Sequence, residues 1–217
     1  MRKKANTKLI LTAAAILLFL AAVPDAGAVG RLTLGLKGGL NSANLRVKSD
    51  ITVSTFRAVN PFAWGGYVSY MINPLFSVQA EVLDSPKGSK LVGGLGGDIG
   101  DTILMYDYTE VPLFLRWAQG FGGGLLPSLY AGGYWAHLRE ATIKTEGRLE
   151  DSSEPLPDQR GYDLGLVFGF SLTYRLGRVE LGADARYSMG LVDVDESAGT
   201  TINHRGFSFL AGIGFGI

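Results

Sequence analysis

Strict alternation of apolar with polar or small residues constrains the fold of this chain more than any other feature. In YDLGLVFGFSLTYR (162–175), every second residue from Tyr162 to Tyr174 is Tyr, Leu or Phe. The intervening positions hold Asp163, Arg175 and mostly small residues. Because successive side chains of a strand point to opposite faces of a sheet, this segment predicts a long strand with one apolar and one polar face.

Seven further segments repeat this alternation, which gives eight predicted strands. They are RLTLGLKGGL (31–40), FAWGGYVSYMI (62–72), LFSVQAEVL (75–83), YTEVPLFLRW (108–117), SLYAGGYWAHLR (128–139), VELGADARYSMG (179–190) and GFSFLAGIGFGI (206–217). The pattern is least regular in 128–139. There we expect Tyr130, Tyr134 and Leu138 to face outward, which places Trp135, His137 and Arg139 inward.

The connections between these segments alternate between short and long. The short ones are Asn73-Pro74, 118–127 and Leu176-Gly177-Arg178, and the long ones span about 41–61, 84–104, 140–161 and 191–205. Outer-membrane barrels have long loops outside and tight turns in the periplasm. The sequence therefore predicts an all-β fold, an eight-stranded up-and-down antiparallel transmembrane β-barrel with both ends on the short-turn side.

The length of the strands favours a membrane over water. From Tyr162 to Tyr174 the chain spans about 40 Å when extended, and a tilt of about 40° reduces this to about 30 Å along the membrane normal. We expect interfacial aromatic residues at the two ends of such strands: Trp64, Trp117, Tyr162, Tyr174 and Tyr187. A soluble lipocalin-like carrier is the remote alternative. It would turn its apolar faces inward and would open with a glycine-x-tryptophan strand, and 34–40 has no tryptophan.

The inward face carries charges of both signs. An eight-stranded barrel is just wide enough for side chains to fill its interior. The expected lumen-facing charges are Lys37, Glu81, Glu110, Arg116, Asp163, Arg175, Glu180, Asp184 and Arg186. Because an unpaired charge would be costly there, we expect a packed network of paired charges. The alternative is a narrow, porin-like channel for small solutes, in which water separates these charges.

The amino terminus reads as a secretory signal peptide. Basic residues precede an apolar run from Leu9 to Val23, and Ala26-Gly27-Ala28 is a small-x-small cleavage pattern. We therefore expect a signal peptide at 1–28 and a barrel domain at 29–217. Four of the 20 basic residues and one of the 20 acidic residues lie before position 29, so the remainder is close to neutral. That balance gives no electrostatic reason to expect nucleic acid as a partner.

Glycine-rich and acidic segments in the predicted loops do not match known ligand motifs. GGLGGDIG (93–100) lacks the lysine and Ser/Thr of a phosphate loop. The acidic residues Asp193, Asp195 and Glu196 offer oxygen ligands for calcium, but they lack the spacing and the glycine of an EF-hand. We expect solvated loops at both places, and no metal site and no cofactor.

No catalytic constellation emerges either. The two histidines, His137 and His204, have no local zinc-ligand spacing. His204 with Asp193 or Asp195 could be imagined as part of a hydrolase at the outer rim, but no nucleophile motif accompanies them. We therefore expect a protein that is not an enzyme. The polar segment TEGRLEDSSEPLPDQRG (145–161) suits surface contact with a partner.

Several segments together resemble the PorT-like family of small outer-membrane β-barrel proteins. They are GLKGGLN (35–41), FSVQAEVLDSPKG (76–88), YTEVPLFLRW (108–117), LYAGGY (129–134), DLGLVFGFSLTY (163–174) and GADARYSMGLVDV (182–194). Glu81, Gly88, Glu110 and Pro112 match motif positions of that family, and no catalytic residue comes with them. One departure is the carboxyl end, where barrels of this kind often have an aromatic residue and this chain has Ile217.

The resemblance implies an integral outer-membrane protein of a Gram-negative-type envelope. The expected partners are outer-membrane lipid, the barrel-assembly machinery during insertion, and envelope proteins that contact the loops or turns. Some members of the family are linked to the secretion and maturation of surface-exposed proteins. The expected function is thus a structural or interaction component of the cell envelope with a filled lumen.

Overall fold

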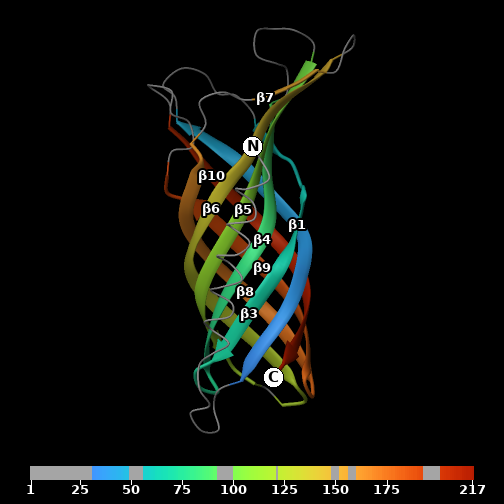
Figure 1. The fold of residues 1–217 in the computed structure, drawn as a ribbon, viewed down its shortest axis with the longest axis vertical. Helices are drawn as coiled ribbons and strands as arrows, with labels where there is room; N and C mark the ends of the chain where they lie inside the picture. The colour runs from blue at the N-terminus through green and yellow to red at the C-terminus, as the bar shows by residue number, and fades with distance from the viewer. Residues whose placement is uncertain are drawn as a thin grey trace, which may run out of the picture.

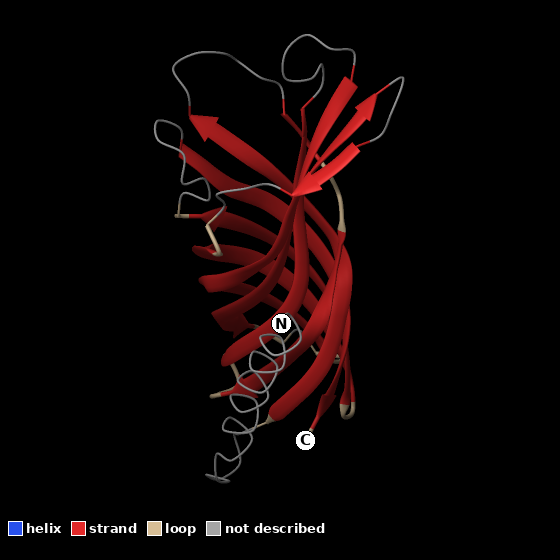
Figure 2. Cartoon of the chain, turned by 45° about the horizontal axis from the view of Figure 1, so that its top comes forward, coloured by secondary structure: helices blue, strands red, loops and turns tan. Residues whose placement is uncertain are grey.

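The computed structural model describes residues 31–48, 56–91, 100–120, 122–147, 152–155, 160–192 and 201–217. These residues form ten β-strands and no helix (Figure 2). The strands are β1 (Leu32–Lys48), β2 (Phe56–Ala58), β3 (Phe62–Met71), β4 (Phe76–Leu91), β5 (Gly100–Ala118), β6 (Leu125–Gly147), β7 (Ser152–Pro155), β8 (Tyr162–Leu176), β9 (Val179–Gly190) and β10 (Thr201–Gly216). In this part of the chain there is accordingly no helix long and apolar enough to cross a membrane. The predicted signal peptide, 1–28, lies outside the described residues.

Eight of the strands close into a barrel (Figure 1). Around the ring the order is β1, β3, β4, β5, β6, β8, β9 and β10, and every neighbouring pair is antiparallel. The last strand pairs with the first, with Gly216 opposite Thr33. The predicted eight-stranded up-and-down barrel is confirmed.

Each short turn is stabilised by residues suited to a tight change of chain direction. Between β8 and β9, Gly177 has a φ of 61°, in the left-handed region that favours glycine. Between β5 and β6, Gly122, Gly123 and Gly124 also have positive φ angles. Between β3 and β4, the side-chain oxygen of Asn73 accepts hydrogen bonds from two backbone N–H groups downstream, both at 2.9 Å. These turns hold the strands in register at one end of the barrel.

At the opposite end, five strands continue further than the sequence predicted. β1 runs to Lys48 and β10 begins at Thr201, in segments predicted as the loops 41–61 and 191–205. The alternation indicated loops at 84–104 and 140–161, but β4 runs to Leu91, β5 begins at Gly100 and β6 reaches Gly147. β2 pairs with the end of β4, and β7 pairs with the end of β6. These segments form a sheet that extends above the ring, which we call the protruding sheet (Figure 1).

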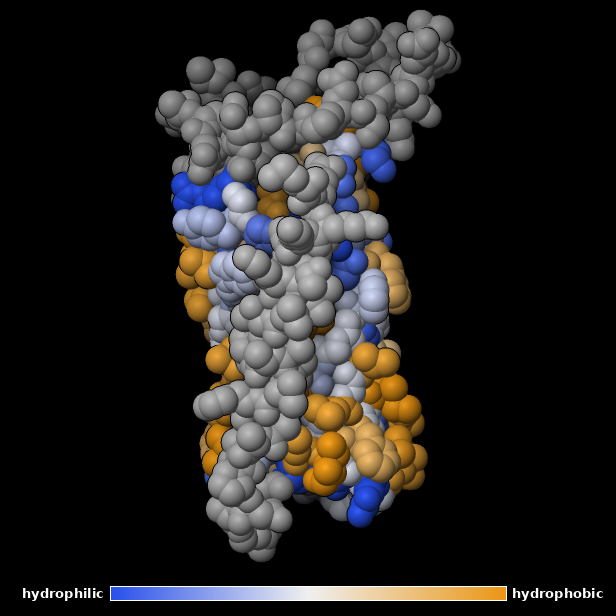
Figure 3. Space-filling view, viewed as in Figure 1, coloured by the Kyte–Doolittle hydropathy of each residue, from blue (hydrophilic) through white to orange (hydrophobic). Residues whose placement is uncertain are grey.

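The outer wall of the barrel is apolar. Every barrel strand contributes exposed, outward-facing hydrophobic side chains, for example Leu36, Trp64, Phe76, Leu115, Leu129, Phe170, Leu181 and Phe209. Figure 3 shows hydrophobic side chains over much of the lower wall, where grey atoms do not hide it, and hydrophilic ones toward the ends. A soluble carrier would have the reverse arrangement, with charges outside and apolar side chains inside. The lipocalin-like alternative does not fit this wall.

The predicted register of the segment 128–139, now part of β6, is wrong. Tyr130 and Tyr134 are 5% and 4% exposed and point into the lumen, while Trp135 is 38% exposed on the outer wall. Leu138 packs against the aromatic cluster of the lumen, and His137 and Arg139 are exposed.

The reason for this register lies on β8, beside β6. A side chain added at Gly169 would meet the ring of Tyr130, and one added at Gly165 would meet the ring of Tyr134. These two inward glycines leave the space that the tyrosine rings occupy. The neighbouring strand thus decides which face of β6 turns inward.

Candidate functional site

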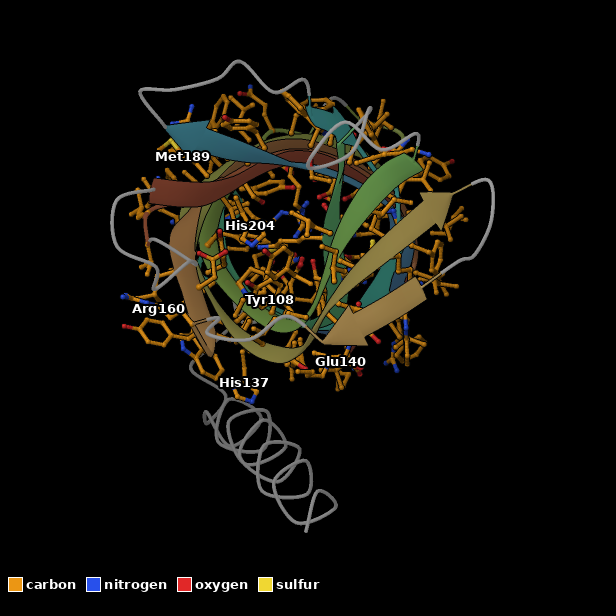
Figure 4. All side chains as sticks on the ribbon, turned by 90° about the horizontal axis from the view of Figure 1, so that it is seen from above. Tyr108, His137, Glu140, Arg160, Met189 and His204 are labelled. Carbon is orange, nitrogen blue, oxygen red and sulfur yellow. The ribbon has the colours of Figure 1, made fainter. Side chains whose placement is uncertain are left out.

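The lumen is filled by polar side chains at three levels. The inward side chains of β4 lie at increasing distance from the short turns, so this strand supplies one residue to each level. Gln79 belongs to the lower layer, Glu81 to the middle layer and Lys87 to the upper layer. Seen from above, side chains crowd the interior of the ring (Figure 4). All three of these β4 residues are at most 3% exposed.

The middle layer is centred on the carboxylate of Glu81. Lys37 donates to its Oε1 at 2.5 Å, and Arg186 donates to its two oxygens at 2.8 Å and 3.2 Å. Gln79 adds a hydrogen bond to Oε1 at 2.7 Å. Lys37 also donates to Asp184 at 2.7 Å. Two cations and two carboxylates from three strands, β1, β4 and β9, therefore neutralise one another.

The upper layer surrounds the ammonium group of Lys87. Its Nζ lies 3.0 Å from Oε2 of Glu110 and 3.3 Å from Oδ2 of Asp163. The same nitrogen lies 4.4 Å from the ring centre of Tyr134 and 5.1 Å from that of Tyr108. A cation over an aromatic face is attracted by the negative charge of the ring face. The layer thus binds one cation between two carboxylates and two rings.

Removal of the Tyr134 hydroxyl tests the upper layer. Tyr134 Oη donates to Asp163 at 2.9 Å, and Asp163 is fully buried. Tyr134→Phe removes one of the two donors to this buried carboxylate oxygen and leaves Lys87 as the other, so we expect the free energy of unfolding to fall by about 1–3 kcal/mol. Tyr174→Phe, on the exposed outer wall, is the matched control, with an expected change within about 0.5 kcal/mol. Urea unfolding of both variants in phospholipid vesicles measures the difference; equal losses would contradict the described layer.

His204 belongs to the top of this layer. Its Nε2 shares a hydrogen bond with Tyr108 Oη at 3.2 Å, and both residues point into the lumen (Figure 4). Asp193 and Asp195, considered above as its partners in a hydrolase, lie outside the described residues. His137 lies on the outside of the barrel, where its ring stacks on Trp135 (Figure 4). The two histidines therefore lie on opposite sides of the barrel wall.

The lower layer closes the lumen on the side of the short turns. Arg116 donates to Gln79, Ser128 and Ser171, and the two serine hydroxyls share a hydrogen bond of 2.7 Å. Nη2 of Arg116 lies 3.8 Å from Oδ1 of Asp184 in the middle layer. One guanidinium thus connects β5 to β4, β6 and β8.

Below this layer lies a cavity of about 430 Å³, open at the short-turn end, which we call the vestibule. Its polar lining includes Arg31, Thr33, Ser69, Ser77, Arg116, Ser128, Thr173, Arg175 and Glu180. Nε of Arg175 donates to Glu180 at 2.9 Å, and Arg31 lies 3.7 Å from the same carboxylate. Above the vestibule, a cavity of about 30 Å³ lies between the lower and middle layers, and one of about 10 Å³ lies in the upper layer.

All nine charged residues predicted for the lumen lie inside the barrel. Seven of them belong to the three layers, and Arg175 and Glu180 line the vestibule. Sequence reasoning missed Lys87, because the segment after Leu83 read as a loop. The alternation of Gln79, Glu81 and Leu83 continues through Ser85 to Lys87, and this continuation was the available signal.

The predicted interfacial aromatics lie on the outer wall. Trp64 and Tyr162 are exposed near the loop ends of their strands, and Trp117 and Tyr174 near the turn ends. Tyr187 is partly buried and packs against Phe207 of β10, with 4.9 Å between the ring centres.

The sequence predicted no ligand site in the loops at 93–100 and 193–196. Nearly all of 93–100, together with Asp193, Asp195 and Glu196, lies outside the described residues. Within the described ranges, no group of three or more His, Cys, Asp or Glu side chains is arranged to hold a metal ion.

Comparisons with known proteins agree with this architecture. The structure is similar to OprG from Pseudomonas aeruginosa, with a TM-score of 0.50 and 13% identity, covering 88% of this chain and 96% of that chain. It is also similar to Neisserial surface protein A, with a TM-score of 0.46 and 15% identity over 85% of this chain and 96% of that chain. At such identities the likeness to OprG concerns the fold. No curated protein sequence matches the chain.

A family model gives the assignment. The model described as "Outer membrane protein beta-barrel domain" matches residues 21–196, which is most of the chain. The match agrees with the closed ring of eight strands and with the apolar outer wall. The chain therefore belongs to the outer membrane protein beta-barrel domain family and is a transmembrane β-barrel of the outer membrane.

Proposed function

We propose that this barrel does not conduct solutes and is not an enzyme, and that it serves as a structural and interaction component of the cell envelope. The observation that carries the proposal is the lumen, in which three successive layers of paired side chains cross the interior. The cavities found beside these layers have volumes of about 30 Å³ and about 10 Å³. A cavity needs about 10–15 Å³ to hold a single water molecule, so these spaces suit a few trapped waters at most.

The protruding sheet supports a role in interaction. It carries β4, β5 and β6 beyond the ring, away from the apolar wall, and its edges are the short strands β2 and β7 (Figure 1). Backbone groups at a sheet edge can pair with an added strand. Contact with another envelope protein is the use that fits a sheet that projects beyond a filled barrel.

The resemblance to the PorT-like family makes this role more specific. It supports a place in the envelope of a Gram-negative-type bacterium, export by the signal peptide at 1–28 and insertion by the barrel-assembly machinery. It also supports a link to the secretion of surface-exposed proteins, in which this chain would contact other components rather than carry out chemistry.

Single-channel recording tests whether the lumen conducts. We expect the refolded protein to give no current steps in a planar bilayer in which a water-filled porin conducts. Reproducible steps that change in the Glu110→Ala/Arg116→Ala double variant would overturn the proposal, because they would locate the ion path between the upper and lower layers. The narrow small-solute channel would then be the function.

A further inference from the structure

The turn end of the barrel has an excess of positive charge. Among the described residues of the strand ends and short turns below the lower layer, Arg31, Arg175 and Arg178 are basic, and Glu180 is the one acidic side chain. The layers above behave differently. Lys37, Lys87, Arg116 and Arg186 face Glu81, Glu110, Asp163 and Asp184 there, so four positive charges meet four negative charges.

The surplus charge points into the vestibule. Arg31 and Arg175 both line it, from β-strand ends far apart in the sequence, and both contact the carboxylate of Glu180. Arg31 Nη2 also donates to the carbonyl oxygen of Gly177 at 2.9 Å. A guanidinium has five N–H donors, so each arginine can bind a further acceptor while these contacts hold it in place. Arg178, in contrast, is exposed at the turn and is not part of the lining.

The remaining lining suits a small polar ligand. Hydroxyl groups of Thr33, Ser69, Ser77 and Thr173 surround the arginines, and Phe76, Leu126 and Ile217 supply apolar surface. The volume of about 430 Å³ lies in the range of small-molecule pockets, about 300–1,000 Å³. In a barrel of this class the short turns face the periplasm. A ligand would therefore enter from the periplasm and stop at Arg116.

We propose that the vestibule is a periplasmic binding site for a carboxylate group, which Arg31 and Arg175 hold. Arginine pairs with carboxylates through parallel N–H···O bonds, which gives both strength and orientation. The carboxylate comes either from a small dicarboxylic solute or from the free carboxyl end of a periplasmic peptide. The proposal does not depend on whether the lumen conducts, so conductance and binding can fail separately.

Calorimetric titration of the folded protein in detergent tests the proposal at constant ionic strength. The probes are succinate, tetra-alanine with a free carboxyl end, and the same peptide with an amidated end. We expect saturable binding of at least one of the two free carboxylates and none of the amide. Binding of succinate alone identifies the small solute as the source, and binding of the free peptide alone identifies the chain end. Failure of both free probes to bind at 10 mM, or equal binding of the amide, would overturn the proposal.

Three variants at the same end of the barrel sharpen the test. Arg175→Gln removes a charge-assisted partner and is expected to weaken binding about tenfold or more. Arg178→Gln removes the same charge outside the vestibule, so its affinity should stay within about twofold, because an exposed charge is screened. Glu180→Gln keeps an amide oxygen that can still accept from the arginines but removes the negative charge that repels a carboxylate ligand, so it is expected to strengthen binding severalfold. Equal weakening by Arg175→Gln and Arg178→Gln would show general attraction to the basic end and would contradict a built site. The opposite effects expected of Arg175→Gln and Glu180→Gln cannot both arise from poorer folding.

Discussion

Glu81→Ala is expected to lower the free energy of unfolding by about 3–5 kcal/mol, since it leaves buried cations without their anion. The side chain of Glu81 is fully buried, and those of Lys37 and Arg186, which bind it, are 3% and 2% exposed. Lys37 retains Asp184 as a partner, but Arg186 has that carboxylate only at 3.9 Å. The expected loss is therefore chiefly the cost of a buried guanidinium without a close counter-ion.

Urea unfolding in phospholipid vesicles measures this loss. The three tryptophans of the chain, Trp64, Trp117 and Trp135, all face outward, so their fluorescence reports when the wall leaves the lipid. Glu180→Ala is the matched control, because it removes a carboxylate that pairs with arginines at the partly exposed end of the barrel. We expect a loss of about 1 kcal/mol or less from the control. If Glu81→Ala cost no more than Glu180→Ala, the middle layer would not hold the barrel together.

Phe170→Arg is expected to destabilise the protein in bilayers by about 2–4 kcal/mol, because it places a charge on the lipid face near the middle of the membrane. Phe170 is 47% exposed near the centre of β8, and its cross-strand neighbours are Leu129 and Ala185. Leu176→Arg is the control, since Leu176 is the last residue of the same strand, beside the short turn. Near the interface the cost falls to about 0–1 kcal/mol.

The dependence of the stability loss on the depth of the arginine shows where the bilayer surrounds the barrel. The two arginine variants are compared in vesicles by the same unfolding measurement. A loss that is large for Phe170→Arg and small for Leu176→Arg follows from a membrane centred on the apolar wall. Equal effects at the two positions would contradict that placement of the membrane.

The sequence predicted which face of a strand points to the lipid wherever lipid and lumen favour different side chains. On β8, Leu and Phe suit one side and Asp163, Ser171 and Arg175 the other, so alternation alone gave the correct orientation. On β6 it did not. A tyrosine suits both a membrane interface and a polar lumen, and the choice for Tyr130 depended on Gly169 in the neighbouring strand. The sequence of β6 alone does not show that the neighbouring strand leaves space for the tyrosine ring.

A proline in β4 is the reason why the sequence did not predict the upper layer. Residues 84–88, DSPKG, begin the segment that the sequence predicted as a long loop, yet β4 continues through them. Pairing of β4 with β3 ends at Asp84 and pairing with β2 begins at Ser89, so Pro86 lies between two strand partners on that side. A proline is tolerated at such a point because no ladder hydrogen bond is lost. The ion pairs themselves could not be predicted, because they depend on the register of strands far apart in the sequence.

The middle layer links barrel closure to charge neutralisation. Lys37 and Asp184 are separated by 147 positions, and Glu81 and Arg186 by 105. The residues come from β1, β4 and β9, and these strands surround one lumen only when the ring is complete. In an unclosed sheet Lys37 would lie far from Asp184, and Glu81 far from Arg186, while the strand edges lacked partners, and hydrocarbon tolerates neither. Half-closed states are therefore high in free energy, and insertion should proceed as one cooperative event in which the last strand pairs with the first as the lumen becomes neutral.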